Sequence, residues 1–174
     1  MALISFADRP RWEDVIMHFS TAGDVIAAFV MSKPGATYPV SAISMGASRF
    51  LKIPRANYVE HWAKNHHLVF RIQSLISTRM GILQDQKVLA RAPLAQKIAA
   101  LLMNLLEKNH DEDALTLPLP LTRREIADAL GSSVESVIRV MSDWSKQNFI
   151  QTTDQNIKLL QPEKIIEILK HSED

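Results

Sequence analysis

Hydrophobic and polar residues change their spacing near residue 54. Before it, short apolar runs are separated by turn residues, as in "WEDVIMHF", "GDVIAAFVM", "YPVSAIS" and "SRFLKIP". Such runs, bounded by Gly, Pro or Asp, predict β-strands. Pro39 predicts that the third strand starts there or forms a sheet edge, because proline has no backbone donor. We therefore expect a β-rich segment up to about Ile53.

Helical spacing begins after Pro54. "RANYVEHWAKN" predicts a short helix, and a long helix follows from about His66 to Ala90. The long helix carries two apolar stripes. Two stripes indicate either one face on the helix's own domain and one on a partner, or a single wide core-facing surface. The first stripe consists of Leu68, Ile72, Leu75, Ile82 and Leu89, with Arg79 and Gln86 at its two missing positions, and the adjacent stripe of Val69, Ile76, Met80 and Leu83.

A second helix is predicted from Pro93 onward, because proline favours the first helical position. The segment "HDEDALTLPLPL" follows that helix, at residues 110–121. It is a polar loop that leads into leucines alternating with Thr and Pro. The two prolines predict an edge strand or an extended lead-in.

The stretch "LTRREIADALGSSVESVIRVM" predicts two short helices joined by a tight turn. Thr122 and Glu125 have the spacing of a capping box. Gly131 stands where a positive φ is needed, and Ser133 can cap the next helix. A helix-turn-helix has this pattern, and so do many plain helical hairpins.

A β-hairpin and a final helix are predicted after this pair. The runs 149–152 and 156–160 flank the turn residues Asp154 and Gln155, and "EKIIEILKH" follows Pro162. A hairpin directly after a helix-turn-helix forms a wing, which favours a winged DNA-binding domain over a plain hairpin.

Composition narrows the classes of protein. The chain has no cysteine, which excludes disulfides, thiol nucleophiles and cysteine-ligated metal centres within it. Neither a signal peptide nor a transmembrane run is visible, so we expect a cytoplasmic protein without a membrane partner. His66 and His67 are adjacent, and adjacent helical side chains diverge by about 100°. We expect no metal site, no cofactor and no catalytic residues, and hence no enzyme.

Charge is unevenly distributed along the chain. Residues 111–174 carry 7 basic and 12 acidic side chains, a net of −5, whereas residues 1–110 carry a net of +6. Bulk charge would therefore not attract the C-terminal part to nucleic acid. Locally placed basic groups would have to do so.

The stretch from Leu121 to Ile150, with its wing, closely resembles the winged helix-turn-helix of the CRP/FNR transcription regulators. Upstream, residues 23–65 resemble the second part of that family's β-roll, and the long helix resembles its dimerisation helix. The resemblance covers roughly residues 12–170. It implies an α+β fold with a partial β-roll over 1–64, a dimerisation helix over 65–92 and a winged helix-turn-helix over 93–174.

The resemblance places a recognition helix over residues 134–148, in the DNA major groove. Arg139 matches the family arginine that contacts guanine, whose O6 and N7 suit a guanidinium fork. Glu135 matches the glutamate that accepts from cytosine and orients the arginine. Considered alone, this pair would be an ordinary surface salt bridge. The base-reading residues implied are Val134, Glu135, Ser136, Ile138 and Arg139. Val134 matches the FNR-like branch, whereas Ile138 departs from both branches, which leaves the half-site sequence open.

Phosphate contacts are implied for positions around the same helices. Helix N-termini and basic side chains suit that purpose. These residues are Thr122, Arg123, Arg124, Ser133, Ser142 and Lys146.

The resemblance further implies a homodimer on double-stranded DNA, with half-sites roughly 34 Å apart, and RNA polymerase as a candidate partner. The expected dimer interface is the first stripe: Leu68, Ile72, Leu75, Arg79, Ile82, Gln86 and Leu89. The alternative is a protein-interaction module that has lost DNA binding and forms heterodimers with a full-length relative.

The effector end departs from the family. The family's cyclic-nucleotide glutamate falls at Ala28 and its Arg-Ser pair at Tyr38-Pro39. An unpaired buried phosphate is very costly, so we expect no cyclic AMP binding of the usual kind, and any small-molecule effector is unknown. The first strands of the roll are expected to be missing before Trp12, in a short form, a late start or a degenerate domain. "ALISF" could replace one strand, and oligomerisation could cover the open edge.

Overall fold

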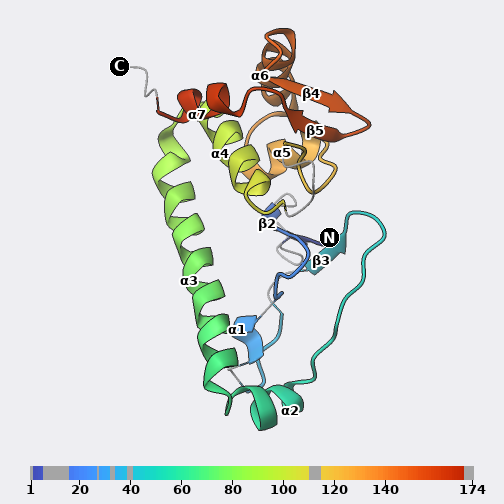
Figure 1. Cartoon of the computed structure of the whole chain (residues 1–174), viewed down its shortest axis with the longest axis vertical. Helices are drawn as coiled ribbons and strands as arrows, with labels where there is room; N and C mark the ends of the chain where they lie inside the picture. Colours follow the sequence, from blue (N-terminus) through green and yellow to red (C-terminus); the bar gives the residue numbers. More distant parts are fainter. Residues whose placement is uncertain are drawn as a thin grey trace.

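The computed structural model describes residues 2–5, 16–26, 28–31, 34–38, 41–109 and 115–170. Its fold is α+β, with a small antiparallel sheet, a long helix and a helical C-terminal unit that carries a β-hairpin. In Figure 1, α3 runs along one side of the molecule, from α2 at one end to α4 and α7 at the other. The strands are β1 Ala2–Ser5, β2 Ile16–Ser20, β3 Ser41–Ser44, β4 Ile150–Thr153 and β5 Asn156–Leu159; the α-helices are α1 Ala28–Met31, α2 Arg55–Asn57, α3 His66–Val88, α4 Leu94–Leu106, α5 Arg123–Leu130, α6 Val134–Lys146 and α7 Pro162–Lys170.

The N-terminal sheet has the order β2-β1-β3, with both pairs antiparallel. The prediction that "ALISF" supplies a strand is therefore confirmed, because β1 is the central strand and Ala2 pairs with both Ser20 and Ser44. β3 lies at an edge, as predicted for the "YPVSAIS" run. Pro39 itself and residues 12–15 of the first run lie outside the described residues.

Two predicted strands are wrong. The run 23–31 does not continue as a strand, because Asp24 closes a turn with Thr21 and α1 follows. A short apolar run has no periodicity that separates a strand from a helix, so its neighbours decide. Residues 48–54 form no regular element, and Phe50 and Leu51 are 60% and 88% exposed. No strand lies beside them, among the described residues, to complete a ladder.

The helical predictions are confirmed with small shifts at the ends. α2 continues into a π-helical turn, Tyr58–Trp62, and α3 ends in a 3₁₀ turn, Leu89–Arg91. Asn65 caps α3 by accepting a hydrogen bond from the Leu68 backbone N–H. Pro93 immediately precedes α4 rather than opening it, a difference of one residue that is ordinary at helix ends.

The hydrophobic core lies in the C-terminal unit. α4 contributes Ile98 and Leu102, which are completely buried, and contacts α5, α6 and α7. The segment before α5 buries Leu117, Leu119 and Leu121 while its prolines alternate with them. Burying a leucine side chain contributes about 1.5–3 kcal/mol, so this core is the main source of stability for the unit. The prediction of an extended lead-in is confirmed, because Leu117 N–H donates to Ile157 O over 2.9 Å.

The N-terminal sheet is anchored to this core through β2. Ile16 and Phe19 are 7% and 4% exposed and belong to the same hydrophobic cluster as α4 and α5. Lys108, just after α4, lies with its Nζ 3.4 Å from both Phe19 O and Asp24 Oδ2. The sheet is therefore held directly against the C-terminal unit.

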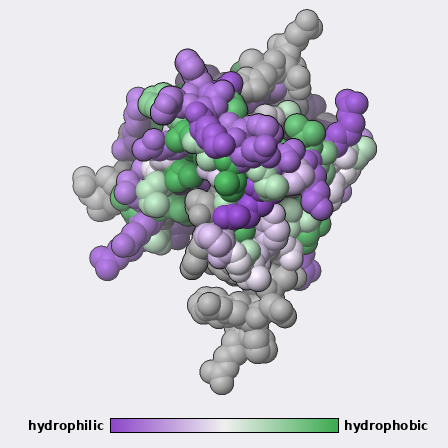
Figure 2. Space-filling view, turned by 90° about the horizontal axis from the view of Figure 1, so that it is seen from below, coloured by the Kyte–Doolittle hydropathy of each residue, from purple (hydrophilic) through white to green (hydrophobic). Residues whose placement is uncertain are grey.

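The outer surface of the N-terminal part mixes hydrophobic and hydrophilic side chains. Figure 2, seen from the α2 end, shows hydrophobic patches interspersed among hydrophilic residues. Tyr38, Ile43 and Phe70 are among the exposed large hydrophobic residues. No helix in the described part of the chain is both long and apolar enough to cross a membrane.

Candidate nucleic-acid interface

The capping box that begins α5 is present as predicted. The Thr122 hydroxyl accepts from Glu125 N–H over 3.1 Å, and Glu125 Oε2 accepts from Thr122 N–H over 2.7 Å. The Thr122 hydroxyl also lies 2.8 Å from Glu125 Oε2. The Thr122 side chain is therefore used in capping α5. Any favourable effect of Thr122 on a phosphate would come from its place at the positive N-terminal end of the helix.

Gly131 makes the turn between α5 and α6. Its φ is +60° and its ψ 43°, in the left-handed region that glycine adopts without a Cβ penalty. Ala127 O accepts from both Gly131 N–H and Ser132 N–H, which ends α5. Ser133 then caps α6 by accepting from Ser136 N–H over 3.2 Å. The predicted turn residues are thus confirmed.

One face of α6 packs on the core and the other faces solvent. Val137 and Met141 are completely buried and Trp144 is 5% exposed. The opposite face carries the proposed base-reading positions. Among these, Glu135, Ile138 and Arg139 are exposed, whereas Val134 and Ser136 are half-buried near the helix start. The helix ends at Lys146, two residues before the predicted end.

Glu135 and Arg139 present their charges outward. They are one helical turn apart, yet no ion pair or side-chain hydrogen bond involves either of them among the described residues. The simple alternative for this pair was a surface salt bridge. In this structure both groups keep their hydrogen-bonding capacity for an external partner.

The residues proposed to contact phosphate differ in their exposure and in the partners they already have. Arg124 and Ser142 are exposed, and Lys146 forms an exposed ion pair with Asp143 over 3.5 Å. Such exposed pairs contribute little to stability, so this pair holds the Lys146 side chain only weakly. The Ser133 hydroxyl is 2.9 Å from that of Ser136.

The Arg123 side chain has a hydrogen-bond partner in the wing that the sequence did not reveal. Its Nη2 donates to Thr152 Oγ1 of β4 over 3.0 Å. Burial lowers the pKa of the Arg123 guanidinium from its ordinary value, although an arginine remains charged. The sequence pattern gave no signal for Thr152, because the two residues are 29 positions apart and meet only in the folded chain.

The wing is a tight hairpin. β4 and β5 are antiparallel, with Thr153 opposite Asn156. Asp154 and Gln155 have φ values of +49° and +69°, which is the signature of a two-residue turn with both central residues left-handed. The predicted hairpin and its turn residues are confirmed. Asp154 places an exposed acidic side chain at the tip of this hairpin.

The two stripes of α3 have different surroundings. Ile72 is 8% exposed, and Leu68, Arg79, Ile82 and Leu89 are half-buried, so this stripe faces the protein's own chain. Burial lowers the pKa of Arg79, and Asp24 opposes that shift. Ile72 is thus buried within the single chain, and its expected contact with a partner stays a prediction. Leu75 is 42% exposed, and nothing is described for the Gln86 side chain.

The adjacent stripe is the one left open. Val69, Ile76, Met80 and Leu83 are 37% to 53% exposed and recur at spacings of 7, 4 and 3. Such spacing forms one continuous seam along a helix. The sequence alone could not decide between the stripes, because both are apolar.

At the effector end, the two positions that would bind a cyclic nucleotide are only partly described. Ala28 begins α1, although nothing is described for its side chain. Tyr38 is 70% exposed, and Pro39 lies outside the described residues. No cluster of three potential metal ligands occurs among the described residues.

Comparison with known proteins agrees with this geometry. Residues 96–168 match the Crp-like helix-turn-helix domain family. The chain is 26% identical over 152 residues to the transcriptional activatory protein AadR of Rhodopseudomonas palustris, covering 86% of this chain and 62% of AadR. It is 28% identical over 158 residues to the nitrogen fixation regulation protein FixK of Bradyrhizobium diazoefficiens, with 86% and 63% covered. The chain thus spans somewhat less than two thirds of these relatives' length.

Solved structures share the whole fold. FixK2 from Bradyrhizobium japonicum superposes with a TM-score of 0.75 at 16% identity, covering 98% of this chain and 84% of that one. A CRP-family transcriptional regulator from Thermus thermophilus gives 0.74 at 19% identity, with 99% and 85% covered. These matches show that the chain shares the fold of solved CRP-family regulators, and that its capped helix-turn-helix and wing lie in the segment that matches the Crp-like helix-turn-helix family.

Proposed function

We propose that this protein is a sequence-specific, DNA-binding transcription regulator that acts as a homodimer. The observation that carries the proposal is the outward presentation of Glu135 and Arg139 from α6, without an internal partner among the described residues. An arginine there can donate to guanine O6 and N7, and the glutamate can accept from a cytosine amino group. Ile138, 46% exposed, is an apolar surface for a thymine methyl group.

Affinity and orientation come from groups around α6. The N-terminus of α5 directs its first backbone N–H groups outward, and Arg123, Arg124 and Lys146 supply positive charge. These groups offset the net −5 of residues 111–174 at the one surface where phosphate would lie. In this proposal the chain has three parts: a partial β-roll over residues 1–64, a dimerisation helix over 65–92 and a DNA-binding winged helix-turn-helix over 93–174.

Two copies are joined through α3 in this proposal. The exposed stripe of Val69, Ile76, Met80 and Leu83 would pack against its counterpart, because a helix seam of this kind loses water-exposed apolar area on pairing. A two-fold assembly then presents two α6 helices to a near-palindromic site, with half-sites about one helical turn apart. The relatives AadR and FixK are named as regulators, which supports the same function here.

Cyclic AMP is not the expected signal. Ala28 and Tyr38 stand where the resembling cyclic-nucleotide members carry a glutamate and an arginine, so the sugar and the phosphate would lack partners. Calorimetric titration with cyclic AMP is expected to give no saturable heat.

The function is tested by selecting bound sites from random duplexes, followed by titration of the selected duplex at several salt concentrations. We expect enrichment of an inverted repeat and an affinity that falls steeply with salt, because phosphate contacts release counterions. Absence of enrichment together with salt-independent, weak binding would instead favour the protein-interaction module. Heterodimer formation with a full-length relative would then be measured directly.

A further inference from the structure

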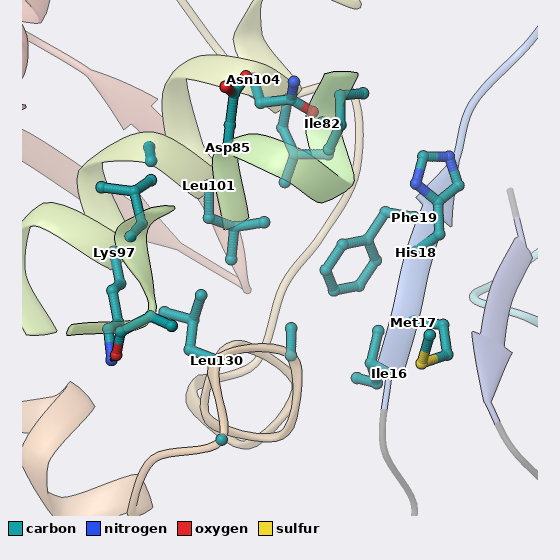
Figure 3. Close-up of a pocket in the computed structure, with 16 residues that line it drawn as sticks. Ile16, Met17, His18, Phe19, Ile82, Asp85, Lys97, Leu101, Asn104 and Leu130 are labelled. Carbon is teal, nitrogen blue, oxygen red and sulfur yellow. The ribbon is translucent and has the colours of Figure 1, made fainter. Parts of the chain in front are cut away.

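A cavity of about 490 Å³ lies where β2 meets the helix-turn-helix. Its walls come from β2, the C-terminal end of α3, α4 and the end of α5 (Figure 3). Phe19 extends from β2 toward Leu101 and Leu130 on the opposite side. Small-molecule sites are commonly cavities of this size, mostly apolar and with a few polar groups.

The lining is apolar except for four side chains. Lys97 and Asp85 carry opposite charges, and Asn104 adds a neutral amide. Lys97 Nζ already donates to Ala90 O over 2.8 Å, which holds the end of α3 to α4. The fourth group, His18, is neutral at pH 7, because burial and the nearby Arg79 and Lys108 lower its pKa to about 4. The charges of the lining therefore sum to zero, which selects against a charged ligand.

The cavity also lies between the N-terminal sheet and the helix-turn-helix, the two parts whose relative position an effector would have to change. One wall is the sheet strand β2, and another includes Gly131, the turn between α5 and the proposed recognition helix. Near the cavity, the two sides are tied by Lys108, whose Nζ lies 3.4 Å from both Phe19 O and Asp24 Oδ2. A molecule that fills the space would contact both walls and so bias the position of α6 relative to α3.

We propose that this cavity is an effector site for an uncharged, mostly apolar small molecule. The proposal rests on the DNA-binding function above, since an effector acts by changing DNA affinity. A ligand that binds one arrangement of the walls more tightly shifts the population toward it. A molecule of about two fused rings or larger fits the volume.

The test uses 2-naphthol as the neutral probe and 2-naphthoate as its anionic counterpart of matched shape. Amide chemical shifts of the ¹⁵N-labelled protein are followed during titration. We expect saturable shifts at Phe19, Leu101, Leu130 and Gly131, with 2-naphthol binding at least about tenfold more tightly than 2-naphthoate, because a buried unpaired charge is costly. No saturable shift at these amides, or shifts confined to the exposed stripe of α3, would overturn the proposal.

Ala100→Leu fills the cavity from α4, and Ala56→Leu adds the same side chain on exposed α2 as a control. Only the first variant is expected to lose 2-naphthol binding. Should Ala100→Leu fail to fold, as thermal unfolding would show, the wild-type titration decides. With 2-naphthol bound, DNA affinity should change at least about threefold, the coupling of a weak effector. Binding of 2-naphthol without a change in DNA affinity would contradict the effector site. Absence of any DNA binding would instead contradict the proposed DNA-binding function, and the 2-naphthol titration would then test only whether the cavity binds a neutral ligand.

Discussion

Arg123 and Thr152 join the start of the helix-turn-helix to the wing. The guanidinium Nη2 donates to the threonine hydroxyl over 3.0 Å, across 29 positions of sequence. The bond uses one of the five N–H donors of the arginine. The remaining donors are not used by this bond, so in the proposed function the same side chain positions the wing and offers charge to a phosphate.

Replacing Thr152 with valine is expected to weaken DNA binding uniformly, by about 1 kcal/mol, because the hydrogen bond is lost while the shape is kept. Arg123→Ala is expected to cost more and to reduce the salt dependence of binding by about one counterion. Fluorescence anisotropy at several salt concentrations measures both. Thr153→Val, on the exposed neighbour, is the control. Equal effects of the two valine variants would contradict the role of the bond.

Arg139→Ala should lower affinity for the selected site by about 1–3 kcal/mol and relax the preference at one base pair, as loss of a guanine contact does. Arg124→Ala is the matched comparison, because it also removes an exposed arginine but is expected to weaken all sequences alike. A gel shift against a half-site library separates the two patterns. If Arg139→Ala kept both affinity and preference, α6 would not be the base-reading helix.

Met80→Glu is expected to convert the proposed dimer into monomers, because it places a charge in the middle of the exposed stripe of α3. Phe70→Glu changes an exposed residue of the same helix outside that stripe and should leave the dimer intact. Sedimentation velocity reports the assembly state. Ile72→Ala should instead lower the stability of the fold, since Ile72 is buried by its own chain. A dimer unaffected by Met80→Glu would exclude this stripe as the interface.

His18 makes stability depend on pH. Burial, Arg79 and Lys108 lower its pKa from 6.5 to about 4, and Asp24 opposes them. Between these two pH values the unfolded chain binds more protons than the folded chain. The free energy of unfolding is therefore unaffected by the titration of His18 above pH 6.5 and decreases as the pH falls toward 4. His18→Gln should flatten this part of the curve, by on the order of 2 kcal/mol after allowance for partial exposure. Urea unfolding at each pH measures it, with exposed His67→Gln as the control. Curves of equal slope would rule out the role of His18.

Gly131→Ala is expected to destabilise the protein by about 1–2 kcal/mol, because a Cβ is disfavoured at a φ of +60°. Nothing lies within 4 Å of the added Cβ, so the cost is conformational rather than steric crowding. Gly131→Asn should cost less, since asparagine tolerates this region. Thermal unfolding compares the two. Equal stability of the alanine and wild-type proteins would show that the turn relaxes.

Local chemistry allowed the C-terminal unit to be predicted closely. The capping box of Thr122 and Glu125, the left-handed Gly131 and the apolar face of α6 are each decided by residues within a few positions of one another. The same is true of the hairpin turn at Asp154 and Gln155. Propensity, capping and periodicity are short-range effects, so they are present in the sequence before any packing occurs.

The N-terminal part was predicted less well because its elements depend on distant partners. The run 23–31 became a turn and α1, and residues 48–54 found no strand to pair with. β1 became a central strand only because β2 and β3 flank it. Strand pairing needs backbone partners far away in sequence, which an apolar run does not specify.

The sequence by itself determined which residues form the capped helix pair, the wing and a long helix with two apolar stripes. Only the tertiary structure decided which stripe is covered by the chain, that Thr152 meets Arg123, and that β2 closes a cavity against α4 and α5. The physical reason is that burial and side-chain contacts across tens of residues are properties of the packed chain. Periodicity fixes the direction of a side chain on its own helix, and packing fixes what that side chain meets.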